Sequence, residues 1–222
     1  MRFRIKIHKE GKRIIIINSI LWVVVALLFF EFGGNKIVNI IVCAGCLFFS
    51  TFMLRFFRVP HREPVTGNHL IISPGDGTVI GVQEVVENEV FHSKCIRISI
   101  FMSVNNIHVT WSPASGVCTY LAHHQGDYYL AWHPKASEFN EHTTIGVRTD
   151  SGHDIMFRQI AGYIARRIVC YAHVGDRLEQ AHQAGFIKFG SRLEVFLPLD
   201  SEILVRQGDK VQGQLSVLAK LN

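Results

Sequence analysis

The hydrophobic pattern divides the chain into two long apolar runs followed by many short ones. The long runs cover residues 14–30 and 37–54, and the polar turn 31–36 joins them. Each run would form about 25 Å of helix, which approaches the ~30 Å thickness of a bilayer's hydrocarbon core. No small-residue cleavage site separates them, which argues against a removable signal peptide. Two such runs in tandem predict a transmembrane helical hairpin, with a shallow interfacial hairpin as the alternative.

From about residue 69 onward the apolar runs are short and are separated by turn residues, a pattern typical of β-strands. Two of the turns, 174–177 and 207–210, share a Gly-Asp-basic sequence, and one helical stretch is predicted at 134–140. This pattern predicts a mainly β chain with a compact β-sandwich or barrel-like catalytic domain. The predicted strands cover residues 70–73, 78–86, 95–102, 116–122, 143–149, 154–160, 167–172, 192–196 and 214–218.

The change in composition near residue 60 predicts two domains. Residues 1–60 would hold a basic N-terminus and the helical membrane hairpin, and residues 61–222 the β-rich catalytic domain. The segment 57–64, with its two prolines and its basic side chains, is the predicted linker between them.

The net charge of +5 is concentrated at the N-terminus, because residues 1–13 carry six basic side chains and one acidic one. The rest of the chain is balanced, whereas a nucleic-acid-binding domain would carry its positive charge on the folded part. We therefore expect an anionic membrane surface as a partner and no nucleic acid. Basic residues precede the first run and follow the second. By the positive-inside rule, this charge bias predicts that both flanks lie in the cytoplasm. The predicted location is the cell (inner) membrane, with the catalytic domain on its cytoplasmic side.

Five arginines are candidates for contact with a lipid phosphate, although a solvated or charge-orienting arginine near a membrane is the favoured interpretation. They are Arg55, Arg58, Arg62, Arg166 and Arg167.

The five cysteines form an odd set without the spacing of a disulfide framework, which indicates a reducing compartment. Cys43 and Cys46 form a C-x-x-C, but they lie in an apolar run and are interpreted as small apolar side chains.

The segment 185–198 places a Gly190–Ser191 step inside an apolar, strand-like run. Glycine weakens a strand interior, so the step indicates either a bulge or chemistry on the backbone. In the second case, the Ser191 hydroxyl would attack the Gly190 carbonyl, which glycine obstructs least. Such a serine needs a base, and the base needs an orienting acid. His108 and Asp76 are the candidates, although a core histidine and an aspartate bonding its own turn are the ordinary interpretations.

Several separated blocks, in this order, resemble the phosphatidylserine decarboxylases in their short bacterial and archaeal form. The blocks are Asp76-Gly-Thr78, the Met-Ser…Asn…His stretch from Met102 to His108, Lys135-Ala-Ser137, Asn140-Glu141, the stretch from Gln159 to Ile168 and the Gly190–Ser191 segment. The resemblance implies a carboxy-lyase of phospholipid biosynthesis that converts phosphatidylserine to phosphatidylethanolamine. It also implies Ser191 as the precursor of a pyruvoyl cofactor, Asp76 as an acid and His108 as a catalytic histidine.

A zymogen that cleaves itself between Gly190 and Ser191 would yield a β-chain of residues 1–190 and an α-chain of residues 191–222. The two chains would stay together as a heterodimer, and a higher oligomer is also compatible with the sequence. The pyruvoyl carbonyl would form a Schiff base with the serine amine of the lipid. Long-form members carry a His-x-x-His pair whose second position is Trp111 here, so the base for self-cleavage is left open.

Two other classes of protein compete with this interpretation. A metal-dependent hydrolase would use the histidines near residues 123–142, but the only close pair is adjacent, and neighbouring side chains diverge on a strand. We therefore expect no metal ligands. A non-catalytic, membrane-anchored β module, such as an adaptor or carrier, would keep an intact chain and make Gly190–Ser191 a bulge.

Overall fold

The computed structural model describes residues 6–32, 35–133, 136–163, 167–188 and 191–222. The chain forms two compact units, Met1–His61 and Arg62–Asn222, which we describe separately. Gly190, on the carbonyl side of the predicted cleavage site, lies outside the described residues, as do Arg166 and Lys135.

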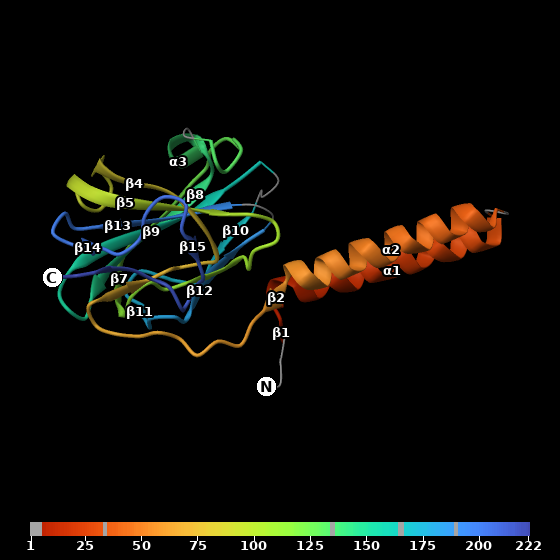
Figure 1. The fold of residues 1–222 in the computed structure, drawn as a ribbon, viewed down its shortest axis with the longest axis horizontal. Helices are drawn as coiled ribbons and strands as arrows, with labels where there is room; N and C mark the ends of the chain where they lie inside the picture. Colours follow the sequence, from red (N-terminus) through yellow and green to blue (C-terminus); the bar gives the residue numbers. More distant parts are fainter. Residues whose placement is uncertain (1–5, 33–34, 134–135, 164–166, 189–190) are drawn as a thin grey trace. The chain divides into compact units, whose positions relative to one another are not determined.

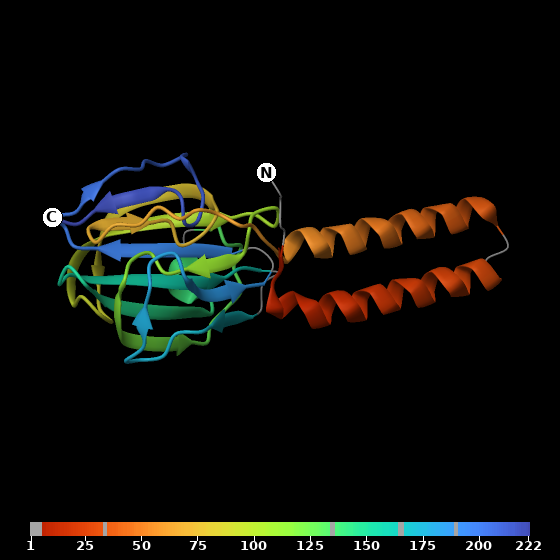
Figure 2. The same cartoon turned by 90° about the horizontal axis from the view of Figure 1, so that it is seen from below.

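The first unit is a helical hairpin. Helices α1 (Lys9–Phe32) and α2 (Lys36–Phe56) run antiparallel to each other (Figures 1 and 2), and the short strands β1 (Lys6–Ile7) and β2 (Arg58–Val59) pair at their base. The Asn35 side chain accepts a hydrogen bond from the Ile37 N–H and so caps α2. The hairpin predicted at 14–30 and 37–54 is therefore confirmed as a helical element.

Both helices are long and apolar enough to cross a membrane. The most apolar 18-residue windows within Lys9–Glu31 and Lys36–Phe56 have mean hydropathies of 2.5 and 2.3, and 0% and 6% of the residues in these windows are buried. The rings of Trp22 and Phe49 stack with centroids 5.3 Å apart, which joins the two helices. A pair of apolar helices with exposed apolar side chains is compatible with membrane association.

The second unit is built around one antiparallel sheet in the order β11-β7-β8-β9-β13-β5-β4-β15 (Figure 1). Two three-stranded sheets, β10-β12-β6 and β14-β16-β3, complete a curled, barrel-like body (Figure 2). The predicted mainly β, sandwich- or barrel-like fold is thus confirmed. The elements are β3 (Leu70–Ile72), β4 (Gly77–Glu87), β5 (Ser93–Met102), β6 (Val109–Trp111), β7 (Gly116–His124), α3 (Ala136–Phe139), β8 (His142–Thr149), β9 (Asp154–Ala161), β10 (Ile168–Cys170), β11 (Arg177–Leu178), β12 (Gln183–Ile187), β13 (Ser191–Leu197), β14 (Glu202–Ile203), β15 (Lys210–Val211) and β16 (Val217–Lys220).

The two Gly-Asp-basic turns have the same geometry and lead into the two edges of the large sheet. Gly175 and Gly208 both have positive φ, 92° and 97°, a conformation that glycine adopts without strain. In each turn the aspartate carboxylate accepts the backbone N–H three residues earlier, at 2.8 and 2.9 Å. The first turn is followed by edge strand β11 and the second by edge strand β15.

The strand-like run at 185–198 is two strands rather than one. β12 belongs to a three-stranded sheet, whereas β13 lies inside the large sheet between β9 and β5. Ser191 therefore begins a strand instead of interrupting one. The strand predicted at 214–218 begins only at Val217, because Gln214 has a φ of 69°, which a strand does not allow.

Candidate active site

Ser191 is the first residue of β13 and is fully buried. It lies opposite Met102 of β5 on one side and Ala161 of β9 on the other. Its Oγ donates a hydrogen bond to the Met102 Sδ at 3.2 Å. Because side chains alternate along a strand, Ser191 shares the face of Leu193 and Val195, which belong to the main hydrophobic core. The hydroxyl is thus held in an apolar interior.

His108 is also fully buried and directly precedes β6. Its ring Nδ1 lies 3.0 Å from the Asn106 carbonyl, and its own carbonyl accepts the Ile187 N–H at 3.1 Å. Ile187 is the last residue of β12 and comes four positions before Ser191. Four residues span at most about 14 Å, so the chain itself keeps His108 near Ser191.

Asp76 is held by an arginine that was considered above as a lipid contact. Both Nη atoms of Arg62 donate to the Asp76 carboxylate, at 2.6 and 2.8 Å, and the Gly213 N–H donates to it at 2.8 Å. The same guanidinium lies 5.6 Å from the centroid of the Trp111 ring. Arg62 is therefore engaged inside the fold, which contradicts its interpretation as a solvated side chain or as a contact for a lipid phosphate.

The strand register places Asp76 at the same end of the sheet as Ser191. β4 begins one residue after Asp76 and pairs with β5, which pairs with β13. Strands about 4.8 Å apart put β4 and β13 roughly 10 Å from each other. Gly75 permits close packing here, since a Cβ at this position would meet the Leu193 Cδ1 at 2.5 Å.

The strand register and the backbone hydrogen bonds gather the three predicted residues at one end of the β body. The carboxylate of Asp76 is bonded to Arg62 and Gly213, and the hydroxyl of Ser191 to Met102. Their proposed roles therefore stay predictions. A catalytic base often comes within hydrogen-bond distance of the proton that it removes only in the reacting complex.

Gln159 is a buried polar residue that was named above only as the start of one family block. It lies opposite Leu193 in β9, on the same face of the sheet as Ser191, and is fully buried. Its Nε2 donates to the Thr110 Oγ1 at 2.9 Å, while its Oε1 has no hydrogen-bond partner within the described part of the chain. An amide at an inward position of an apolar strand is the signal that could have identified it.

The sequence is similar to a known protein family over most of its length. A sequence model of the phosphatidylserine decarboxylase family matches residues 49–219. This chain belongs to the phosphatidylserine decarboxylase family. The predicted resemblance is confirmed, and membership makes the chain an enzyme, a carboxy-lyase.

Its relatives match the chain over nearly its full length, the helical hairpin included. A phosphatidylserine decarboxylase proenzyme of Amoebophilus asiaticus is 44% identical, covering 98% of this chain and 97% of its own. Proteins of the same name from Phocaeicola vulgatus and Porphyromonas gingivalis are 42% and 39% identical, covering 98% and 97% of this chain and 96% and 99% of theirs.

In this family member we expect Arg62→Ala to destabilise the β unit strongly. The pair is nearly buried, with 13% and 10% of the side chains exposed, so removing Arg62 leaves the Asp76 carboxylate without its cation. Breaking such a pair costs about 3–5 kcal/mol. The melting temperature of the purified chain in detergent should fall by on the order of 10 °C.

The matched control for Arg62→Ala is Arg148→Ala. The Arg148–Asp154 pair has the same 2.6 Å distance, but 53% and 49% of its side chains are exposed. Its loss should cost less than about 1 kcal/mol. Equal shifts in melting temperature for the two variants would show that Arg62 does not stabilise the fold through Asp76.

Proposed function

We propose that this enzyme decarboxylates phosphatidylserine to phosphatidylethanolamine, using a pyruvoyl group that self-cleavage at Gly190–Ser191 generates. The name of its relatives supports both the substrate and a precursor form. The observation that carries the proposal is the position of Ser191. It is a buried serine at the start of a central strand, and the segment before it is bonded to the backbone of His108.

In the proposed cleavage, the Ser191 Oγ loses its proton to His108 and attacks the Gly190 carbonyl carbon. The C–N bond between the two residues breaks, and an ester to Oγ replaces it. Elimination then breaks the Ser191 Cβ–Oγ bond and releases residue 190 as a carboxylate. Water hydrolyses the dehydroalanine that is left, and ammonia departs. Asp76 is the proposed acidic member of the site, with its orientation fixed by Arg62.

The residues around Ser191 fit the group that this cleavage would form. The Ser191 side chain faces the apolar core and contacts the Met102 sulfur, so a small carbonyl group would replace it without leaving a charge buried. When bound, a pyruvoyl group supplies an electrophilic carbonyl that accepts the electrons released with carbon dioxide. His108 is the proposed source of the proton that returns to the substrate's α-carbon.

The proposed heterodimer follows from the place of the α-chain in the fold. Residues 191–222 would contribute β13 to the middle of the large sheet, β15 to its edge, and β14 and β16 to a smaller sheet. β13 pairs with β5 along its whole length, from Ser191 to Leu197. Strands shared in this way keep the two chains together after the bond between them is cut.

The membrane hairpin fits a lipid substrate. We propose that both flanks of α1 and α2 are cytoplasmic, because the basic residues of 1–13 and Arg55 and Arg58 lie on those flanks. A cytoplasmic β unit tethered to the inner membrane would meet the headgroup by lateral diffusion.

The proposal is tested with the purified full-length chain in mixed micelles containing phosphatidylserine labelled at its carboxyl carbon. We expect labelled carbon dioxide and an equal amount of phosphatidylethanolamine, with no label released from free serine. A cleaved chain that releases no label from phosphatidylserine would contradict the substrate. An uncleaved and inactive chain would favour the membrane-anchored β module.

A further inference from the structure

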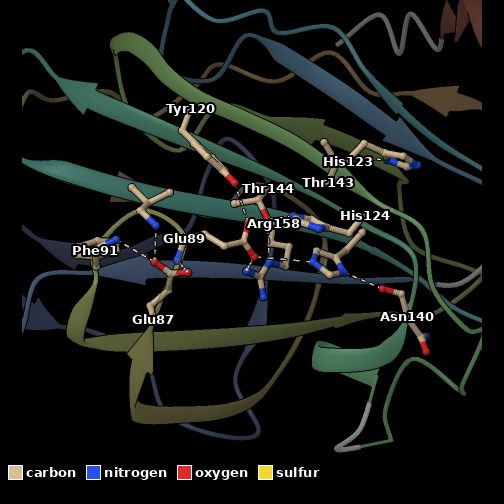
Figure 3. A network of polar contacts seen from close by, with 12 residues as sticks. Glu87, Glu89, Phe91, Tyr120, His123, His124, Asn140, Thr143, Thr144 and Arg158 are labelled. Atoms are coloured by element: carbon tan, nitrogen blue, oxygen red, sulfur yellow. Dashed lines mark hydrogen bonds and ion pairs between the residues drawn. The ribbon is translucent and has the colours of Figure 1, made fainter.

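A polar cluster lies on the face of the large sheet opposite Ser191. In β13, Arg192 and Glu194 alternate with the core residues, and their face continues across β9 through Arg158. At its β7–β8 end it carries three side chains able to bind a metal ion, Glu89, His124 and His142. Figure 3 labels the first two of them. No step of the proposed cleavage or decarboxylation uses them.

The three donors come from separate segments and converge. His124 of β7 lies opposite His142 of β8, and the two rings stack with centroids 4.6 Å apart. Glu89, from the turn between β4 and β5, has its Oε2 3.0 Å from the His124 Nε2 and its Oε1 4.0 Å from the His142 Nε2. One ligand atom from each residue lies within 4.8 Å of the others. Ligands about 2.0–2.1 Å from a tetrahedral zinc ion are about 3.3 Å apart, so small side-chain rotations suffice.

His142 already presents the nitrogen that a metal needs. Its Nδ1 lies 2.7 Å from the Asn140 carbonyl, which can only accept, so in the neutral ring this nitrogen carries the proton and Nε2 carries the lone pair. A carbonyl behind a histidine is the usual orienting partner in metal sites.

Glu89 is oriented by its neighbours so that Oε2 faces His124. Arg158 donates to Oε1 at 2.7 Å, while Oε2 accepts from the Tyr120 hydroxyl at 3.4 Å and lies 3.0 Å from the His124 Nε2. A metal ion bound between Oε2 and this nitrogen would replace the proton that they share. The turn that carries Glu89 is itself ordered, because the Glu87 carboxylate accepts the N–H groups of residues 89, 90 and 91 at 2.7–2.8 Å.

We propose that Glu89, His124 and His142 bind one divalent transition-metal ion, with Zn²⁺ the best match to two imidazoles and one carboxylate. Glu89 would bind through Oε2 while Arg158 holds Oε1. An open cavity of about 410 Å³ borders Glu89 and Arg158. The ion ties the β4–β5 turn to β7 and β8, so its role is to stabilise the fold. Decarboxylation at Ser191, on the other face, does not depend on it.

The test uses the full-length chain in detergent, freed of metal with a chelator and then titrated with Zn²⁺ by calorimetry. Co²⁺ is added in a parallel experiment, because its visible spectrum reports the ligands around it. The variants are His124→Asn and Glu89→Gln. The matched control is His123→Asn. His123 directly precedes His124 in the same strand, but its Nδ1 lies 2.9 Å from the Thr143 Oγ1 (Figure 3).

We expect the unmodified chain and His123→Asn to bind one ion with equal affinity and to melt at a higher temperature with Zn²⁺ present. Each ligand variant should lose at least about 100-fold in affinity and lose the Co²⁺ spectrum, while still cleaving at Ser191. Unchanged Zn²⁺ affinity in His124→Asn and Glu89→Gln would overturn the proposal. So would an equal loss in His123→Asn, or a chain that binds no ion. A ligand variant that no longer cleaves would contradict the separation of this site from Ser191.

Discussion

Replacing Ser191 with alanine is expected to leave one uncut chain of 222 residues and to remove decarboxylase activity. Alanine has no oxygen to attack the preceding carbonyl, so neither the ester nor the pyruvoyl group can form. The change is small in volume, and the lost hydroxyl bonds only the Met102 sulfur among the described residues, so the fold should survive. Activity should fall by at least ~10⁴-fold, as when a covalent catalyst is removed.

The matched control is Ser201→Ala in the same C-terminal segment. Ser201 is also buried, and its Oγ has no hydrogen-bond partner among the described residues. Its removal should leave cleavage and activity intact. Gel electrophoresis resolves one chain from two, and the lipid assay measures turnover. If Ser191→Ala were cut at the same place, another residue would be the nucleophile.

His108→Ala is expected to accumulate uncut precursor. As the proposed base for the Ser191 hydroxyl, His108 should contribute about 10²–10⁴-fold to the rate of cleavage. The rate is followed by electrophoresis after synthesis of the chain in a cell-free system. His182→Ala is the control, because 71% of that side chain is exposed and it pairs with Glu179 in a surface turn.

A second variant separates chemistry from folding. His108→Asn keeps a side-chain donor near the Asn106 carbonyl, which the Nδ1 of His108 contacts, but it has no nitrogen able to act as a base. It should fold as judged by circular dichroism and still fail to cleave. Normal cleavage in both variants would remove His108 from the mechanism and leave the base to be found elsewhere in the site.

Features that depend on neighbouring residues were predicted well from the sequence. The helical hairpin follows from two continuous apolar runs, and most strands of the large sheet follow from short apolar runs between turn residues. The repeated Gly-Asp-basic turns were visible as sequence, although their placement before the two edge strands required the structure.

Features that depend on long-range pairing were not predictable in the same way. The Arg62–Asp76 pair also contacts Gly213, far along the chain, so composition near residue 60 suggested a membrane role for Arg62 instead. The same limit applies to the proposed metal site of Glu89, His124 and His142. Adjacent histidines diverge on a strand, as expected, but His124 meets His142 through the β7–β8 register, which spacing along one strand does not reveal.

The most direct test of the account is the intact mass of the purified protein. It predicts two polypeptides, residues 1–190 and 191–222, the smaller of them lighter than its serine-started sequence by the mass of one ammonia. Reduction with borohydride in the presence of phosphatidylserine should then add the lipid to the smaller chain alone. A single full-length mass that persists after incubation with detergent and lipid would contradict the account and reduce Ser191 to a serine at the start of a strand.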